Sequence, residues 1–501
     1  MTNINKELSR LLNYGLQKEL IRSDDLHYCA NRMLALLNLQ SFEWCEFEPE
    51  TPDNPAEILE NILDFAATQG LLPVNTTTYR DILDTELMNC MTPFPGEIAE
   101  KFDRLAERDK TAATDYFYKL SRDNNYIRTA RVKKDLMWTA PTKYGDIVIT
   151  VNLSKPEKDP KDIAAAKNTA TSDYPKCMIC IENEGFKGNA VKAARGNHRM
   201  IPFPLCGEKF FLQYSPYVYY NEHCIILNAK HTPMKIDKVA FQKLLGFVER
   251  FPHYFIGSNA DLPIVGGSIL SHDHFQGGRY EFPMARAEVY RNISINGFDG
   301  LEAGLVNWPM SVIRLKSTDT AQLADAAEAI LASWQKYSYP SAGILAFTGD
   351  TPHNTITPIA RFRDGKYELD LVLRNNRTTQ QHPDGLFHPH KEYHNLKKEN
   401  IGLIEVMGLA ILPARLKTQL ATLQHHLENP ESDAELFAND SMSAHFDWYK
   451  SLKAKYDGTK PAGEFLENQI GIAFAEILEN AGVYKTDDEG KAAFMRFVEQ
   501  V

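Results

Sequence analysis

Residues 271–278 read Ser-His-Asp-His-Phe-Gln-Gly-Gly, and this run is the strongest signal in the chain for both fold and chemistry. If it forms a strand, alternate side chains point the same way, and His272, His274 and Gln276 share one face. Glycine pairs bracket the run, and glycine within a strand often marks the close approach of a ligand or another backbone. The spacing therefore predicts a strand with one chemically active face.

Histidine on such a face suits phosphate chemistry. Imidazole is a neutral nitrogen nucleophile near pH 7, because its unperturbed pKa is about 6.5, and it attacks phosphorus without a second base. A second interpretation stays open, since two histidines one residue apart are also typical of a solvated strand edge. The bare pattern does not separate the two.

The wider sequence around the run resembles a known family. His-x-His-x-Gln is the active-site pattern of the hexose-1-phosphate uridylyltransferases, within the histidine-triad superfamily. Residues 266–278, Gly-Gly-Ser-Ile-Leu-Ser-His-Asp-His-Phe-Gln-Gly-Gly, and the run that starts Lys-Lys-Glu-Asn-Ile-Gly at 397–413 resemble the class II galactose-1-phosphate uridylyltransferases. The resemblance extends over nearly the whole chain. It implies transfer of UMP from UDP-glucose to galactose 1-phosphate by a ping-pong mechanism through a uridylyl-histidine.

The resemblance also implies roles for two residues of the motif. His274 is the expected nucleophile, and Gln276 occupies the position where nucleotide hydrolases of the superfamily usually have a third histidine. An amide cannot titrate, but its NH2 group donates hydrogen bonds to phosphoryl oxygens and so holds the intermediate without supplying a proton for hydrolysis. The chain departs from the class I enzymes at Asp273, where those enzymes have proline.

Length and composition limit the alternatives. A chain of 501 residues is expected to form two or three units. Its formal net charge of −11 argues against nucleic-acid binding, which normally needs a basic face. No run reaches membrane-spanning length, the first residues do not resemble a signal peptide, and seven scattered cysteines do not form a disulfide framework. We expect a cytoplasmic enzyme acting on small molecules.

Periodicity predicts an α+β fold. Apolar residues at helical spacing mark 4–22 and 57–69, a further helix covers 321–337, and helical periodicity returns after 416. Strands are expected at 145–153, 217–227, 312–315, 343–347 and 367–374. The resemblance adds a duplicated histidine-triad-like half-barrel, with an antiparallel sheet and flanking helices. The expected divisions are 1–139 (helical), 140–285 (first half), 286–415 (second half) and 416–501 (helical).

Two cysteines have the spacing of a structural zinc site. Cys177 and Cys180 form a Cys-x-x-Cys pair, which zinc favours, whereas the residues after it do not open the helix that a redox motif requires. By position, the resemblance to class I enzymes adds His231 and His272 and completes a Cys2His2 set. Plain thiols beside a loop histidine remain the alternative.

Other polar clusters are candidate substrate contacts. Sugar hydroxyls and phosphates need hydrogen-bond donors, and in the context of a uridylyltransferase four short segments supply them. The predicted contacts are Arg195, Asn197, Asn228, Ser271, Arg374 and Asn376. A second metal site stays open at four clustered histidines, for which a solvated loop and a phosphate contact at a subunit boundary are the alternatives: His382, His388, His390 and His394.

Two rival functions remain. A nucleotide-sugar phosphorylase or dinucleotide hydrolase of the same superfamily would use the same motif. A zinc-stabilised binding module would use the cysteines structurally and leave the histidines inert. Whether the chain forms a homodimer stays open.

Overall fold

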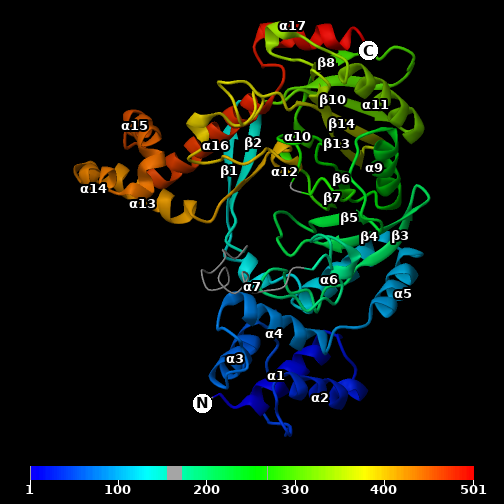
Figure 1. Cartoon of the computed structure of the whole chain (residues 1–501), viewed down its shortest axis with the longest axis vertical. Coiled ribbons are helices and arrows are strands. Elements are labelled where there is room, and N and C mark those ends of the chain that lie inside the picture. The colour runs from blue at the N-terminus through cyan, green and yellow to red at the C-terminus, as the bar shows by residue number, and fades with distance from the viewer. Residues whose placement is uncertain (1, 155–171, 268) are drawn as a thin grey trace. The chain divides into compact units, whose positions relative to one another are not determined.

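The computed structural model describes residues 2–154, 172–267 and 269–501. The chain divides into two compact units, and each of them combines two segments of the sequence. Unit 1 contains Met1–Lys134 and Ser154–Thr232, and unit 2 contains Asp135–Leu153 and Pro233–Val501. The predicted α+β class is confirmed, because helices and antiparallel sheets both occur (Figure 1).

The N-terminal part of unit 1 is helical, as predicted. The side chain of Asn3 caps the first helix, and Leu8, Leu11 and Leu12 form its buried stripe. This helix ends sooner than the predicted 4–22, because Glu19 adopts a positive φ of 59°. The helices are α1 (Ile4–Gln17), α2 (Leu26–Leu36), α3 (Ala56–Thr68), α4 (Thr77–Asn89), α5 (Pro95–Ala106), α6 (Lys110–Asp123) and α7 (Thr129–Val132).

Unit 1 also holds three antiparallel strands, β3 (Ile201–Leu205), β4 (Glu208–Tyr214) and β5 (Cys224–Asn228). Cys206 and Gly207 make the turn between the first two strands with positive φ angles, as tight hairpins require. The predicted strand at 217–227 is wrong in its first half. Main-chain hydrogen bonds close short turns there instead, from Tyr219 to Tyr217 and from His223 to Tyr220.

Unit 2 is built on a sheet whose strand order is β7-β6-β13-β14-β10-β9-β8. Helices α9 (Lys238–Arg250) and α11 (Thr320–Trp334) pack against each other and against this sheet (Figure 1). The predicted strand at 343–347 is wrong, since Gly343 has a φ of +74° and ends a short 3-10 helix. The strands are β6 (Phe255–Gly257), β7 (His274–Gly278), β8 (Val289–Ile293), β9 (Glu302–Val306), β10 (Val312–Ser317), β13 (Asn354–Arg363) and β14 (Lys366–Asn375).

The order of elements along the chain supports the predicted duplication. Three antiparallel strands, a helix and a pair of antiparallel strands occur as β3-β4-β5-α9-β6-β7. The same series recurs as β8-β9-β10-α11-β13-β14, with a short 3-10 helix and the short strands β11 (Phe347–Thr348) and β12 (Thr351–Pro352) between α11 and β13. The active-site motif therefore lies on the last strand of the first series.

A second, smaller sheet in unit 2 joins β1 (Leu136–Thr142), β2 (Gly145–Val151) and β15 (Leu409–Leu412). The long helix α16 (Ala462–Ala481) packs against β1. The remaining C-terminal part is helical, as predicted, and no helix among the described residues is both long and apolar enough to cross a bilayer. The other helices are α10 (Pro283–Arg286), α12 (Leu403–Val406), α13 (Leu416–Glu428), α14 (Asp433–Phe437), α15 (Phe446–Lys455) and α17 (Asp488–Val498).

Candidate active site

Strand β7 carries two of the three polar residues of the motif. His274 is its first residue and Gln276 lies two positions later, so their side chains share one face of the sheet. Phe275 points the other way and is buried, with 1% of its surface exposed. His272 lies at a bend before the strand, which is therefore shorter than the sequence indicated.

The ring of His274 is held in one orientation. Its Nδ1 lies 2.7 Å from the main-chain carbonyl oxygen of His272, which can only accept, so Nδ1 carries the proton and Nε2 presents its lone pair. Only 7% of the residue is exposed, and burial lowers the pKa of His274 below its ordinary value. The ring is therefore neutral near pH 7.

Arg374 lies on the same face of the unit 2 sheet as Gln276. In the strand register Gln276 pairs with Gly257, and Gly257 pairs with Ile359. Two and four residues before Ile359 along β13 are Thr357 and Thr355, and the latter pairs with Arg374. Because paired residues share a face, the register places Arg374 on the same face of the sheet as His274 and Gln276.

The guanidinium of Arg374 is buried, with 1% of the residue exposed, and burial lowers its pKa to about 10. It donates to the hydroxyl of Thr357 at 3.2 Å and to the carbonyl of Ile401 at 2.9 Å. Nothing in the described part of the chain accepts from its Nε. A bound anion could accept a hydrogen bond from this buried N–H group.

The other predicted contacts in unit 2 flank this face. Asn376 follows β14, and its Oδ1 lies 2.7 Å from Nδ1 of His353. Ser271 lies in the turn immediately before His272. Asn376 therefore directly follows β14, whereas Ser271 lies three residues before β7.

The cysteine pair and His231 come together in unit 1. The two sulfur atoms of Cys177 and Cys180 lie 3.3 Å apart, and Sγ of Cys180 lies 3.0 Å from Nδ1 of His231. Their ligand atoms all lie within 4.8 Å of one another, as a single ion would require. Burial raises the pKa of the Cys180 thiol to about 12, an effect that a bound cation would reverse. The fourth predicted ligand, His272, belongs to unit 2.

Arg195 and Asn197 line a cavity of about 150 Å³ in unit 1. The guanidinium of Arg195 lies 5.5 Å from the centre of the Tyr126 ring, in a cation–π contact. Asn197 is fully buried and donates to the carbonyl of Asn124 at 2.7 Å, while no donor among the described residues reaches its Oδ1. Asn228, at the end of β5, accepts from the main chain of Lys230.

The structure adds residues that the sequence analysis missed. Arg128 and Arg131 line the same cavity as Arg195, although Asp84 and Asp81 pair with them. Asn259 follows β6, and a side chain on Gly267 would come within 2.6 Å of its amide. These arginines and Asn259 belong to no recognisable sequence motif, and only the fold brings them to the cavity and to Gly267.

The histidine cluster after β14 does not form a metal set. Within the described residues, no three of these histidines direct ligand atoms to one point. His388 is buried and contacts Asn400 at 3.2 Å, and His394 contacts the carbonyl of Pro389 at 3.0 Å.

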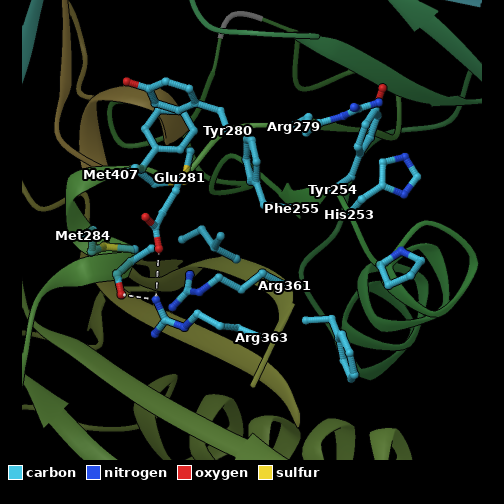
Figure 2. A pocket seen from close by; sticks show the side chains of 15 residues that line it. His253, Tyr254, Phe255, Arg279, Tyr280, Glu281, Met284, Arg361, Arg363 and Met407 are labelled. Atoms are coloured by element: carbon cyan, nitrogen blue, oxygen red, sulfur yellow. Dashed lines mark hydrogen bonds and ion pairs between the residues drawn. The ribbon is translucent and has the colours of Figure 1, made fainter. Parts of the chain in front are cut away.

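A cavity of about 300 Å³ lies beyond the C-terminal end of β7 in unit 2 (Figure 2). Arg361 and Arg363 form its floor, and both are engaged in ion pairs, with Glu368 and Glu281 among their partners. None of the predicted site residues is among those described as lining it. Its walls include His253, Tyr254, Phe255, Arg279, Tyr280, Met284 and Met407.

Comparisons with known proteins identify the family. The family model for the galactose-1-phosphate uridyl transferase N-terminal domain matches residues 19–233, and that for the C-terminal domain matches 247–448. The chain is 51% identical to the galactose-1-phosphate uridylyltransferase of Clostridium acetobutylicum, over 99% of both chains. It is 48% identical to that of Fusobacterium nucleatum, over 99% of this chain and 98% of the relative. For the Bacillus subtilis enzyme the identity is 49%, over 100% and 98%. The chain therefore belongs to the galactose-1-phosphate uridyl transferase family.

Proposed function

We propose that this enzyme transfers UMP from UDP-glucose to galactose 1-phosphate and releases UDP-galactose and glucose 1-phosphate. Relatives that match over the full chain carry the name galactose-1-phosphate uridylyltransferase. The observation that carries the mechanism is the hydrogen bond from Nδ1 of His274 to the carbonyl of His272. It leaves Nε2 as a neutral, directed nucleophile.

In the first half-reaction, Nε2 of His274 attacks the α-phosphorus of UDP-glucose. A P–N bond forms, the bond from that phosphorus to the bridging oxygen breaks, and glucose 1-phosphate leaves with the electron pair. The leaving group is already a phosphate, so it needs little help from a general acid. In the second half-reaction, a phosphate oxygen of galactose 1-phosphate attacks the same phosphorus and frees the histidine.

Gln276 supports the intermediate on the same face of β7. Its amide NH2 donates to the non-bridging oxygens, with main-chain amides near the glycine pairs as further donors. Because the amide cannot give or take a proton, it does not activate water against the P–N bond. The uridylyl group thus persists until the second sugar phosphate arrives.

We assign zinc to Cys177, Cys180, His231 and His272. The convergence of the first three ligand atoms and the soft sulfur donors support a structural zinc ion. Bound there, zinc would stabilise the local fold and restrain His272, whose carbonyl orients the nucleophile.

Six polar residues are proposed substrate contacts. We assign Arg195, Asn197 and Asn228 of unit 1, together with Ser271, Arg374 and Asn376 of unit 2, to the phosphates and hydroxyls of the substrates. The unused buried atoms of Arg374 and Asn197 support this role.

We also propose a cytoplasmic enzyme, and we take a homodimer as the working assembly, to be checked by light scattering.

Product analysis tests the function. Purified enzyme is incubated with UDP-glucose, with and without galactose 1-phosphate, and the nucleotides and sugar phosphates are separated. Formation of UDP-galactose and glucose 1-phosphate only with the acceptor supports the transferase. Release of glucose 1-phosphate with inorganic phosphate as acceptor, or with water alone, would instead identify a phosphorylase or a hydrolase. No turnover under any condition would favour a binding module.

A further inference from the structure

Lys243 is an unusual residue on the buried side of helix α9. Other buried residues of this helix include Phe241, Leu244 and Phe247, and only 7% of Lys243 is exposed. Removing an ammonium group from water is costly unless an opposite charge compensates for it. A lysine kept at such a position calls for a partner inside the protein.

That partner is Asp273, the residue between the two histidines of the motif. Nζ of Lys243 lies 3.0 Å from Oδ2 of Asp273, and 8% of Asp273 is exposed. The pair joins helix α9 to the chain immediately before β7. Both residues belong to unit 2, so the contact lies within one compact unit.

The geometry points to Lys243 as a positioning residue for the nucleophile, an inference that rests on the proposed function. His274 depends on one main-chain atom, the carbonyl oxygen of His272, for the orientation of its ring. The peptide that contains this oxygen joins His272 to Asp273, so an anchor on the Asp273 side chain limits its movement. Lys243 therefore acts through Asp273 on the direction of the His274 lone pair.

The alternation of side chains makes this arrangement feasible. His274 and Gln276 face one side of the sheet, whereas Phe275 points to the opposite side. Asp273 lies two positions before Phe275, and its carboxylate contacts Lys243 of helix α9. The ion pair can therefore restrain the chain before β7 on the side opposite His274 and Gln276, and the face that carries these two residues stays open to substrate.

Kinetics on single and double variants test the inference. Lys243→Met keeps the volume of the side chain but removes its charge, Lys243→Arg keeps the charge, and Asp273→Asn removes the other partner. We expect Lys243→Met to lower the rate of uridylylation by about 10- to 100-fold, with KM for UDP-glucose within about twofold, because a misaligned nucleophile slows chemistry more than binding. Lys243→Arg should restore most of the rate. The double variant Lys243→Met/Asp273→Asn should be no slower than the worse single variant.

A matched control separates positioning from general loss of stability. Arg314 is buried and pairs with Asp370 at 2.7 Å, on strands away from β7. Arg314→Met should lower the Tm as Lys243→Met does, yet leave the uridylylation rate unchanged at temperatures where both variants are folded. Unchanged rates in folded Lys243→Met, or equal losses in Arg314→Met, would overturn the inference while the function stands. If the parent enzyme forms no uridylyl-histidine at all, the proposed function fails and the positioning role with it.

Discussion

The imidazole of His274 donates a hydrogen bond to the main-chain carbonyl of His272, two residues before it, at 2.7 Å. This contact is local in sequence, and both residues belong to unit 2. It gives His274 a defined tautomer with Nε2 unprotonated, as the proposed nucleophile requires. The first predictions follow from this geometry.

Replacing His274 with asparagine should abolish transfer while the protein stays folded. Asparagine keeps a hydrogen-bonding side chain of similar reach but has no nucleophilic ring nitrogen, so we expect activity to fall by roughly 10³-fold or more. UDP-glucose labelled at the α-phosphate should label the parent covalently and leave the variant unlabelled. Equal labelling of the two proteins would reject this nucleophile.

Replacing Gln276 with histidine should raise the share of the intermediate that is lost to water. An imidazole beside the phosphoryl group can take a proton from water, which the amide cannot do. The measurement is the ratio of UMP to UDP-galactose formed from UDP-glucose at several concentrations of galactose 1-phosphate. A Gln276→Asn variant serves as the control, since it keeps the amide, and an unchanged ratio in Gln276→His would refute the argument.

Replacing Cys177 with serine should remove metal from the protein. The hydroxyl is a poor zinc ligand compared with a thiolate, and the remaining donors do not complete a tetrahedral set. Elemental analysis should show about one zinc ion per parent chain and far less in the variant, with a lower Tm in the variant. Cys206→Ser is the matched control, because Cys206 is exposed in the turn between β3 and β4. A parent protein without zinc would contradict the assignment.

Replacing Arg195 with alanine should weaken substrate binding and leave the fold intact. Its guanidinium lies over Tyr126 in a cavity, where it can meet an anionic group. We expect KM for UDP-glucose to rise by roughly tenfold, which corresponds to about 1.4 kcal/mol. Arg104→Ala removes an exposed arginine of the same unit and should have no effect. Equal KM values for the two variants would exclude the contact.

His445 should make stability depend on pH. Burial, with a smaller contribution from Arg415, lowers its pKa to about 4. The unfolded chain binds this proton at about pH 6.5, before the folded chain does, so the free energy of unfolding should fall between pH 6.5 and 4. The expected loss from this group is about 2–3 kcal/mol. Urea unfolding of His445→Gln should show a flatter dependence than the parent, whereas His425→Gln, at an exposed position, should match the parent.

Sequence alone was sufficient for the local features. The period of two along 274–278 placed His274 and Gln276 on one face, because a strand alternates its side chains whatever surrounds it. The spacing of Cys177 and Cys180 predicted two sulfur atoms close together, because the two cysteines are only three positions apart in the chain. Helical periodicity likewise located α1 and α3.

Only the tertiary structure decided which distant residues meet. Arg374 shares the face of His274 and Gln276 through the register of β14 with β13, β13 with β6 and β6 with β7, and the pairing of β13 with β6 joins segments about a hundred residues apart. Lys243 finds Asp273 because α9 packs on the sheet, and no pattern in the sequence links the two. Gly343 shows a limit of local patterns, since its positive φ ends a 3-10 helix at the first residue of a segment that composition alone favoured as a strand. Sequence patterns reflect interactions within a few residues, whereas the packing of distant segments determines which residues come into contact.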